Sequence, residues 1–211
     1  MTTGSGNRLL DGLNPEEWAL LEPHCHEITV ARGALLTEAG QVATHLYFPV
    51  TAVLSLVGIT HTGATVEVGL VGREGVASVS AALGPQRVPF RIVAQLEGTA
   101  WRIESPVITR QLHACRQLHE RFLGYSHTVI AQVGQSAICN RFHTAKQRLA
   151  RWLLLLADRV DSSELALTHE FIANMVGGPR SAVTEAAAAL REAGAIDYRR
   201  GRVIITSVPV L

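Results

Sequence analysis

The sequence predicts an α+β fold made of three segments, because the spacing of its apolar residues changes twice along the chain. Residues 1–104 carry short β-branched or aromatic runs separated by glycines, which is typical of strands joined by tight turns. Residues 105–138 carry apolar residues at every third or fourth position, which predicts one long helix. Residues 139–211 predict a compact set of helices that ends in a two-stranded hairpin.

The first segment is expected to open with a short helix and to continue as strands. Asn14 is suited to cap the helix and Pro15 to occupy its first position, with Glu16 and Glu17 in the first turn. The runs expected to form strands are ITVARGALLTEAG, THLYFPVTAVLSLVGI, ATVEVGLVG and PFRIVAQLEGTAWRI. Strands and turns at this spacing favour a sandwich or a barrel.

The helix predicted over 105–138 has Ser105 as its expected cap and Pro106 in its first turn. Its apolar seam is sustained over about four heptads, which allows two interpretations. The helix either lies along the barrel as a core element or pairs with a second copy of the chain, and its length of about 45 Å favours pairing. The residues assigned to this dimer seam are Leu112, Leu118, Phe122, Tyr125 and Val129.

The third segment predicts three helices, FHTAKQRLARWLLLLADRV, LTHEFIANMV and RSAVTEAAAALREAG, and a hairpin that turns at Gly201. Gly177 can end the second helix in the left-handed conformation, and Pro179 fits the first turn of the third. A turn of about three residues therefore joins the two helices, as in a helix-turn-helix motif. We expect Val183, Ala187 and Leu190 to face inward, with the alanines at 186–189 allowing close packing.

The outward residues at the start of the third helix are expected to meet base edges in the major groove of DNA. They are Arg180, Ser181, Thr184 and Glu185. Arginine can bond guanine O6 and N7 together, and glutamate can accept from cytosine N4. The residues expected to contact DNA phosphates are Thr168, His169, Arg199, Arg200 and Arg202. A surface ion pair between Arg180 and Glu185 is the alternative.

Composition and spacing argue against several other functions. The net charge is +1, and residues 139–211 hold 10 basic against 7 acidic side chains. This asymmetry is too mild to identify a nucleic-acid partner by itself.

The sequence has no apolar run of about 18 residues and no export signal, so we expect a cytoplasmic protein without a membrane partner. It shows no nucleophile–base pair or phosphate-binding loop, so we expect no enzymatic activity.

No metal or cofactor is predicted. Cys25, Cys115 and Cys139 are too few for a four-cysteine iron–sulfur cluster and are expected to be free thiols. His24 and His26 would share one face of a strand, but no third ligand can be identified near them.

With these patterns, the chain resembles the Crp/Fnr transcription regulators over nearly its whole length. LTHEFIANMVGGPRSAVTEAAAALREAGAIDYRRGRVIIT is similar to their winged helix-turn-helix, and ARGALLTEAGQVATHLYFPVTAVLSLV with GLVGREG is similar to their cyclic-nucleotide-binding-type β-roll. The resemblance implies a double-stranded β-helix (β-roll) effector domain over 1–104, a dimerisation helix over 105–138 and a DNA-binding domain over 139–211.

The same resemblance implies a homodimer on a two-fold symmetric operator, with a hinge near residues 136–141. RNA polymerase and a small-molecule effector of unknown identity are further partners that we consider. The rival interpretation is a ligand-binding signalling module whose C-terminal domain makes protein contacts.

Two departures from the family pattern affect the expected ligands. In members that bind cyclic nucleotides, a Gly-Glu pair is followed by Arg-Ser-Ala or Arg-Thr-Ala, whereas here Glu74 is followed by Arg87-Val88-Pro89. Arg87-Val88-Pro89 lacks the hydroxyl group of the usual Ser or Thr, and Pro89 has no backbone N–H donor, so cyclic AMP binding is not expected. Candidates for lining an effector pocket are Arg73, Glu74, Arg87 and Arg91.

The second departure lies in the DNA-reading helix. Pro179, Ser181 and Glu185 stand where the family usually has a Ser or Thr cap, a glutamate and an arginine. We therefore expect the chain to recognise a DNA base sequence different from the one that is usual for the family.

Overall fold

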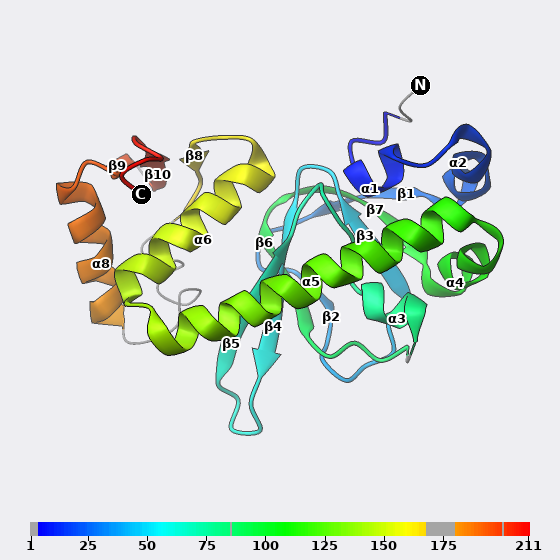
Figure 1. Cartoon of the computed structure of the whole chain (residues 1–211), viewed down its shortest axis with the longest axis horizontal. Coiled ribbons are helices and arrows are strands. Elements are labelled where there is room, and N and C mark those ends of the chain that lie inside the picture. Colours follow the sequence, from blue (N-terminus) through cyan, green and yellow to red (C-terminus); the bar gives the residue numbers. More distant parts are fainter. Residues whose placement is uncertain (1–3, 85, 168–179, 200) are drawn as a thin grey trace. The chain divides into compact units, whose positions relative to one another are not determined.

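The computed structural model describes residues 4–84, 86–167, 180–199 and 201–211. The chain forms two compact units, residues 1–133 and residues 134–211, which are considered separately (Figure 1). None of the helices in these described ranges combines the length and the apolar character that crossing a bilayer requires.

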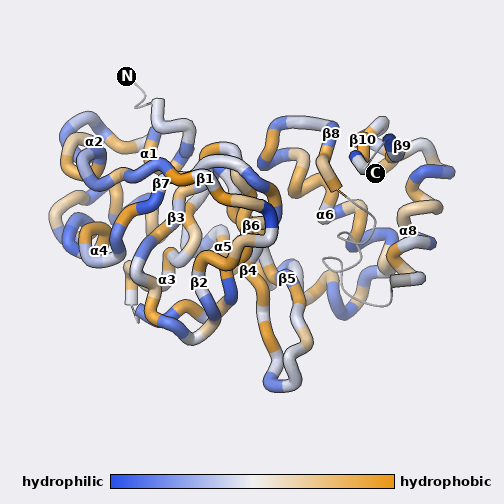
Figure 2. Tube along the Cα trace, turned by 180° about the vertical axis from the view of Figure 1, so that it is seen from behind, coloured by the Kyte–Doolittle hydropathy of each residue, from blue (hydrophilic) through white to orange (hydrophobic). Residues whose placement is uncertain are grey.

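The N-terminal unit contains two antiparallel sheets. One has the order β1-β7-β3 and the other the order β2-β6-β4-β5. The strands are β1 (His26–Val30), β2 (Leu35–Thr37), β3 (His45–Pro49), β4 (Val53–Ile59), β5 (Thr65–Val71), β6 (Arg91–Leu96) and β7 (Gly98–Glu104). Phe48, Leu54, Ile92 and Ile103 are fully buried in one continuous core, and the tube of Figure 2 shows the hydrophobic character of β4 and β6. The expected strands and the β-roll are thus present.

Short helices surround these sheets. They are α1 (Arg8–Asp11), α2 (Pro15–Leu21), the 3-10 helix η1 (Glu22–His24), α3 (Val79–Leu83) and α4 (Ser105–Ala114). Asn14 caps α2 as predicted, because its Oδ1 accepts from Glu17 N–H at 2.8 Å. Ser105 does not cap α4: it is the first helical residue, and its hydroxyl donates to Ala43 O at 2.6 Å.

The structure corrects the predicted continuous helix over 105–138. Cys115 has an extended backbone and separates α4 from α5 (Arg116–Phe142). Both carboxylate oxygens of Glu17 on α2 accept hydrogen bonds from the main chain at the start of α5, from Gln117 N–H and Leu118 N–H at 2.9 Å each. A side chain about 100 residues away therefore satisfies donors that a helix start leaves unpaired. At its other end, α5 continues through the hinge expected near 136–141.

The C-terminal unit consists of helices packed beside a small sheet. Its elements are α6 (Ala145–Val160), β8 (Glu164–Leu165), α8 (Arg180–Glu192), β9 (Ile196–Arg199) and β10 (Arg202–Ile205), and the sheet order is β8-β10-β9. A capping box between Thr144 and Gln147 starts α6, whose apolar face includes the buried Leu149, Leu153 and Leu156. The predicted helix over 169–176 and the turn at Gly177 and Pro179 lie outside the described residues.

Candidate nucleic-acid interface and effector pocket

Helix α8 has one buried face and one exposed face, as its sequence predicts. Val183, Ala187 and Leu190 are buried, and α8 packs against α6. Ser181, Thr184 and Glu185 are all exposed within the first two turns. Arg180 is the first residue of the helix, and its side chain lies outside the described residues. The packing of the alanine-rich face therefore directs polar side chains outward near the N-terminal end of α8.

The hairpin formed by β9 and β10 presents two of the predicted arginines at the surface, each beside an acid. Arg199 Nε lies 3.1 Å from Asp197 Oδ2, and Arg202 Nη1 lies 3.2 Å from Glu164 Oε2. The Tyr198 main-chain N–H and the Arg199 side chain donate to Asp197 and hold its pKa below the ordinary value. Exposed ion pairs are weak, so both arginines can exchange these acids for phosphates. Thr168, His169 and Arg200 lie outside the described residues.

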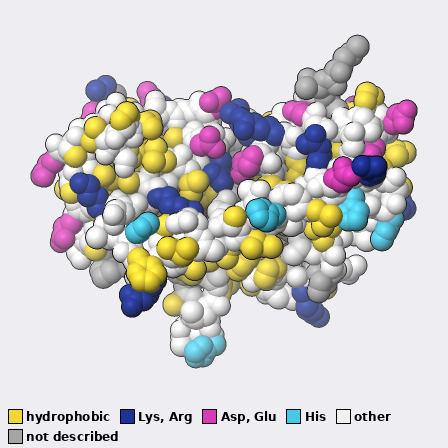
Figure 3. Space-filling model, in the orientation of Figure 1, with side chains coloured by type: hydrophobic (Ala, Val, Ile, Leu, Met, Phe, Trp, Pro, Cys, Tyr) yellow, Lys and Arg dark blue, Asp and Glu magenta, His cyan; other side chains and the backbone are white. Residues whose placement is uncertain are grey.

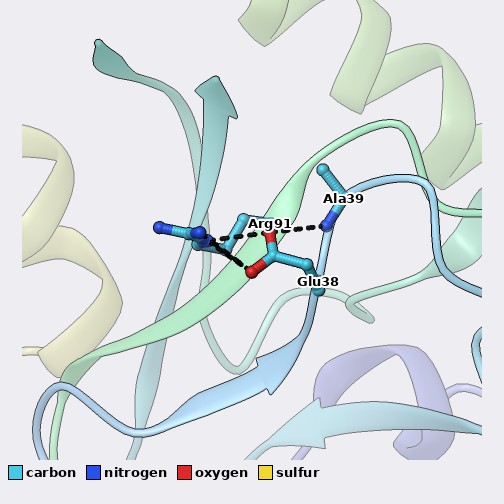
Figure 4. A network of polar contacts seen from close by, with 3 residues as sticks. All are labelled: Glu38, Ala39 and Arg91. Carbon is cyan, nitrogen blue, oxygen red and sulfur yellow. Dashed lines mark hydrogen bonds and ion pairs between the residues drawn. The ribbon is translucent and has the colours of Figure 1, made fainter. Parts of the chain in front are cut away.

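None of the four predicted effector-pocket residues belongs to the lining of the cavity described below. Arg91 makes a two-pronged ion pair with Glu38, with Nε 2.9 Å from Oε1 and Nη2 2.8 Å from Oε2 (Figure 4). Hydrogen bonds from Arg91 lower the pKa of Glu38, and Ala39 N–H adds a third donor at 3.0 Å. Arg87 Nη1 donates to Gly40 O at 2.7 Å.

The other two candidates belong to the loop between β5 and α3. Glu74 Oε1 accepts from Gly72 N–H at 3.1 Å, and the main-chain oxygen of Arg73 accepts from Arg8 N–H at 2.7 Å. Neither residue belongs to the lining of the cavity found nearby.

That cavity of about 470 Å³ lies between the β-roll, the segment around α3, and α5. Leu56 and Ile92 contribute from the sheet, Val79 from α3, and Val129 and Val133 from α5. Every described residue that lines it is uncharged, and its polar side chains are those of Ser78, Ser80 and Ser126. The lining of this cavity is therefore mainly apolar and contains none of the four charged candidates.

The structure also corrects the predicted dimer seam. Leu112, Leu118, Phe122 and Tyr125 are buried in the core of their own chain, and the partly buried Val129 packs against it. Tyr125 fits so closely that a Cβ added at Gly75 would lie 2.0 Å from its ring. The helix thus lies along the β-roll, as in the other interpretation of the sequence, and the four buried side chains are covered by their own chain.

A different face of α5 is exposed and apolar. Leu123 is 53% exposed and Ile130 is 71% exposed, and together we call them the α5 stripe. Figure 3 shows hydrophobic side chains gathered along α5. The spacing of seven between Leu123 and Ile130 could have identified the stripe, but the longer buried seam beside it dominates the pattern.

Comparison with known proteins agrees with this geometry. Residues 147–211 match the family model of the Crp-like helix-turn-helix domain. The chain is similar to FixK2 from Bradyrhizobium japonicum, with a TM-score of 0.75 and 14% identity over 88% of this chain and 94% of that one. It is also similar to the c-di-GMP responsive global regulator CLP of Xanthomonas campestris, with a TM-score of 0.74 and 12% identity over 92% and 100% of the two chains.

A transcriptional regulator of the CRP/FNR family from Thermus thermophilus gives a TM-score of 0.67 and 18% identity over 87% of this chain and 95% of that one. No curated protein matches the chain in sequence. The chain therefore has the fold of the Crp/Fnr transcription regulators, and its C-terminal unit carries a Crp-like helix-turn-helix domain. The resemblance predicted from the sequence is confirmed.

Proposed function

We propose that this chain is a sequence-specific DNA-binding transcription regulator that works as a homodimer on a two-fold symmetric operator and does not depend on cyclic AMP. The observation that carries the proposal is the division of α8 into a buried face and an exposed face with Ser181, Thr184 and Glu185. In helix-turn-helix proteins, the N-terminal residues of such a helix read base edges. Arg180 and Glu185 are the base-reading side chains that we favour, with Arg199, Arg200 and Arg202 on flanking phosphates.

The α5 stripe supports the homodimer. An exposed apolar row along a long helix is the kind of surface that a second helix covers. A closed dimer places the same patch on both subunits, so α5 would pair with α5 and present two copies of α8 to two half-sites. Half-sites read in this way lie about 34 Å apart or at multiples of that distance.

Independence from cyclic AMP rests on where the charged groups lie. Arg87 and Arg91 make contacts with Gly40 O and Glu38, and Pro89 supplies no N–H donor. A phosphate needs such donors and charges. We further propose a cytoplasmic protein whose partners include RNA polymerase and a small-molecule effector, which would shift the balance between existing arrangements of the DNA-binding units.

Recovery of genomic DNA fragments bound by the purified full-length protein tests this function. Fragments should share an inverted repeat, and mobility shifts should show binding at least about 10³-fold tighter than to a scrambled sequence. Cyclic AMP should leave this affinity unchanged. Equal affinity for the repeat and for the scrambled DNA would contradict sequence-specific binding, and no binding to either DNA would instead support the signalling module whose C-terminal domain contacts proteins.

A further inference from the structure

We infer that the cavity beside α5 binds an uncharged, mostly hydrocarbon or aromatic small molecule that carries a hydroxyl or carbonyl group. This inference rests on the proposed function, because it names the chemical class of that regulator's effector. The cavity volume of about 470 Å³ falls within the range of about 300–1,000 Å³ that is common for small-molecule sites.

The shape of the cavity gives it an interior and a mouth. Leu56, Val79 and Ile92 are buried, whereas Gly84 and Ile130 are exposed, so the cavity opens to solvent beside α5. An apolar lining that is open to solvent is in contact with water, which is unfavourable. An apolar ligand would remove the lining from water.

The electrostatics of the lining exclude a charged ligand in favour of a neutral one. Within the described residues that line the cavity, no side chain can balance a carboxylate or a phosphate. Arg87 and Arg91 lie outside that lining, and both carboxylate oxygens of Glu38 hold the Arg91 guanidinium. An unpaired ion buried among aliphatic side chains would pay a large desolvation penalty.

The polar groups of the lining point to one neutral hydrogen-bonding group on the ligand. Ser78 is buried, and its hydroxyl oxygen has no hydrogen-bond partner within the described residues. Its backbone is left-handed, with a φ of 70°, a conformation that non-glycine residues rarely adopt and that often occurs at ligand sites. Ser126 already donates to Phe122 O at 2.8 Å, so its hydroxyl oxygen remains available as an acceptor.

Binding of Nile red, an uncharged dye that fluoresces in apolar surroundings, tests the inference on the full-length protein. We expect saturable binding at one site per chain, with displacement by 1-decanol. Decanoate at pH 8, cyclic AMP and c-di-GMP should displace the dye much less at equal concentration. Displacement by cyclic AMP or c-di-GMP, or stronger displacement by decanoate than by decanol, would overturn the inference.

Three variants locate the dye. Val133→Asp places a charge in the cavity and Ser80→Phe fills part of it, so each should weaken dye binding by about tenfold or more. Leu20→Asp introduces the same charge at an exposed apolar residue of α2, outside both the cavity and the α5 stripe, and should keep the affinity of the unaltered chain. Unchanged dye binding in both cavity variants would place the dye elsewhere and overturn the inference.

Circular dichroism establishes whether each variant is folded, and if Val133→Asp is not, Ser80→Phe decides. The dye experiment is independent of DNA binding. A chain that binds the dye but no operator contradicts the proposed regulator, whereas a chain that binds its operator but no dye contradicts this inference.

Discussion

The side-chain amide of Gln132 on α5 forms hydrogen bonds with both main-chain groups of Leu70 on β5. Leu70 N–H donates to Gln132 Oε1, and Gln132 Nε2 donates to Leu70 O at 3.2 Å. Because β5 is the edge strand of its sheet, the amide supplies the pairing that a further strand would supply. Val129 and Val133 lie on the same stretch of α5 and line the cavity, so these bonds hold the cavity wall against the β-roll.

Replacement of Gln132 by alanine should destabilise the protein. The change removes both hydrogen bonds to the buried Leu70, and losses of this kind cost about 1–3 kcal/mol in the free energy of unfolding. Gln135→Ala is the matched control, because the Gln135 amide donates to Cys139 Sγ within the same helix. Urea unfolding followed by circular dichroism measures the free energy of unfolding of both variants. A similar loss in the two variants would show that the Leu70 contact adds little.

Replacement of Leu123 by aspartate should convert a dimer into a monomer. Leu123 belongs to the α5 stripe, and two aspartates facing each other across a dimer axis would be buried without partners. Leu20→Asp on α2 is the control, because Leu20 is 48% exposed and lies outside the stripe. Sedimentation at micromolar concentration should show monomers for the first variant and dimers for the second. A Leu123→Asp dimer would contradict pairing through α5.

Stability at alkaline pH should depend on Cys25. Burial, together with the negative charge of Glu22, raises the pKa of this thiol to about 12, from 9.0. Above pH 9 the unfolded chain therefore releases a proton that the folded chain keeps, so the free energy of unfolding falls as the pH rises towards 12.

The Cys25→Ala variant lacks this titration and serves as the reference. Between pH 8 and pH 10, the unaltered chain should lose about 1 kcal/mol more than the variant in urea unfolding. Parallel losses in both proteins would show that the thiol ionises equally in the folded and unfolded states.

Helix starts and buried helix faces that depend on neighbouring residues could be predicted from the sequence. Asn14 with Pro15 marked the start of α2, and the spacing of Val183, Ala187 and Leu190 marked the inner face of α8. These signals depend on neighbours within a few residues, so one sequence is enough to find them.

The features that the sequence did not predict arise from contacts between distant residues. Glu17 caps α5 across about 100 positions, which starts a new helix after Cys115 where the apolar spacing continues without a break. The apolar spacing along α5 predicted that one face of the helix is buried, but not which surface covers it. Packing against the β-roll of the same chain and pairing with a second copy would produce the same spacing. Likewise, Arg91 was assigned to a pocket because its partner Glu38, 53 positions earlier, could not be foreseen.

Two variants should distinguish a residue that reads bases from a residue that contacts phosphates. Arg180→Ala removes the arginine at the first position of α8, so it should abolish the preference for the operator over random DNA. Arg200→Ala removes a hairpin charge and should weaken binding to all sequences alike, lowering the salt slope by about 1. Mobility shifts on operator and random DNA at several salt concentrations measure both effects.

Arg202→Ala provides a further comparison within the hairpin. Arg202 pairs with Glu164, so its removal also leaves an acid near the DNA, and the loss of affinity should be at least that of Arg200→Ala. Equal losses on operator and random DNA for Arg180→Ala would count against α8 as the reading helix, because a residue that touches base edges must change the ratio of the two affinities.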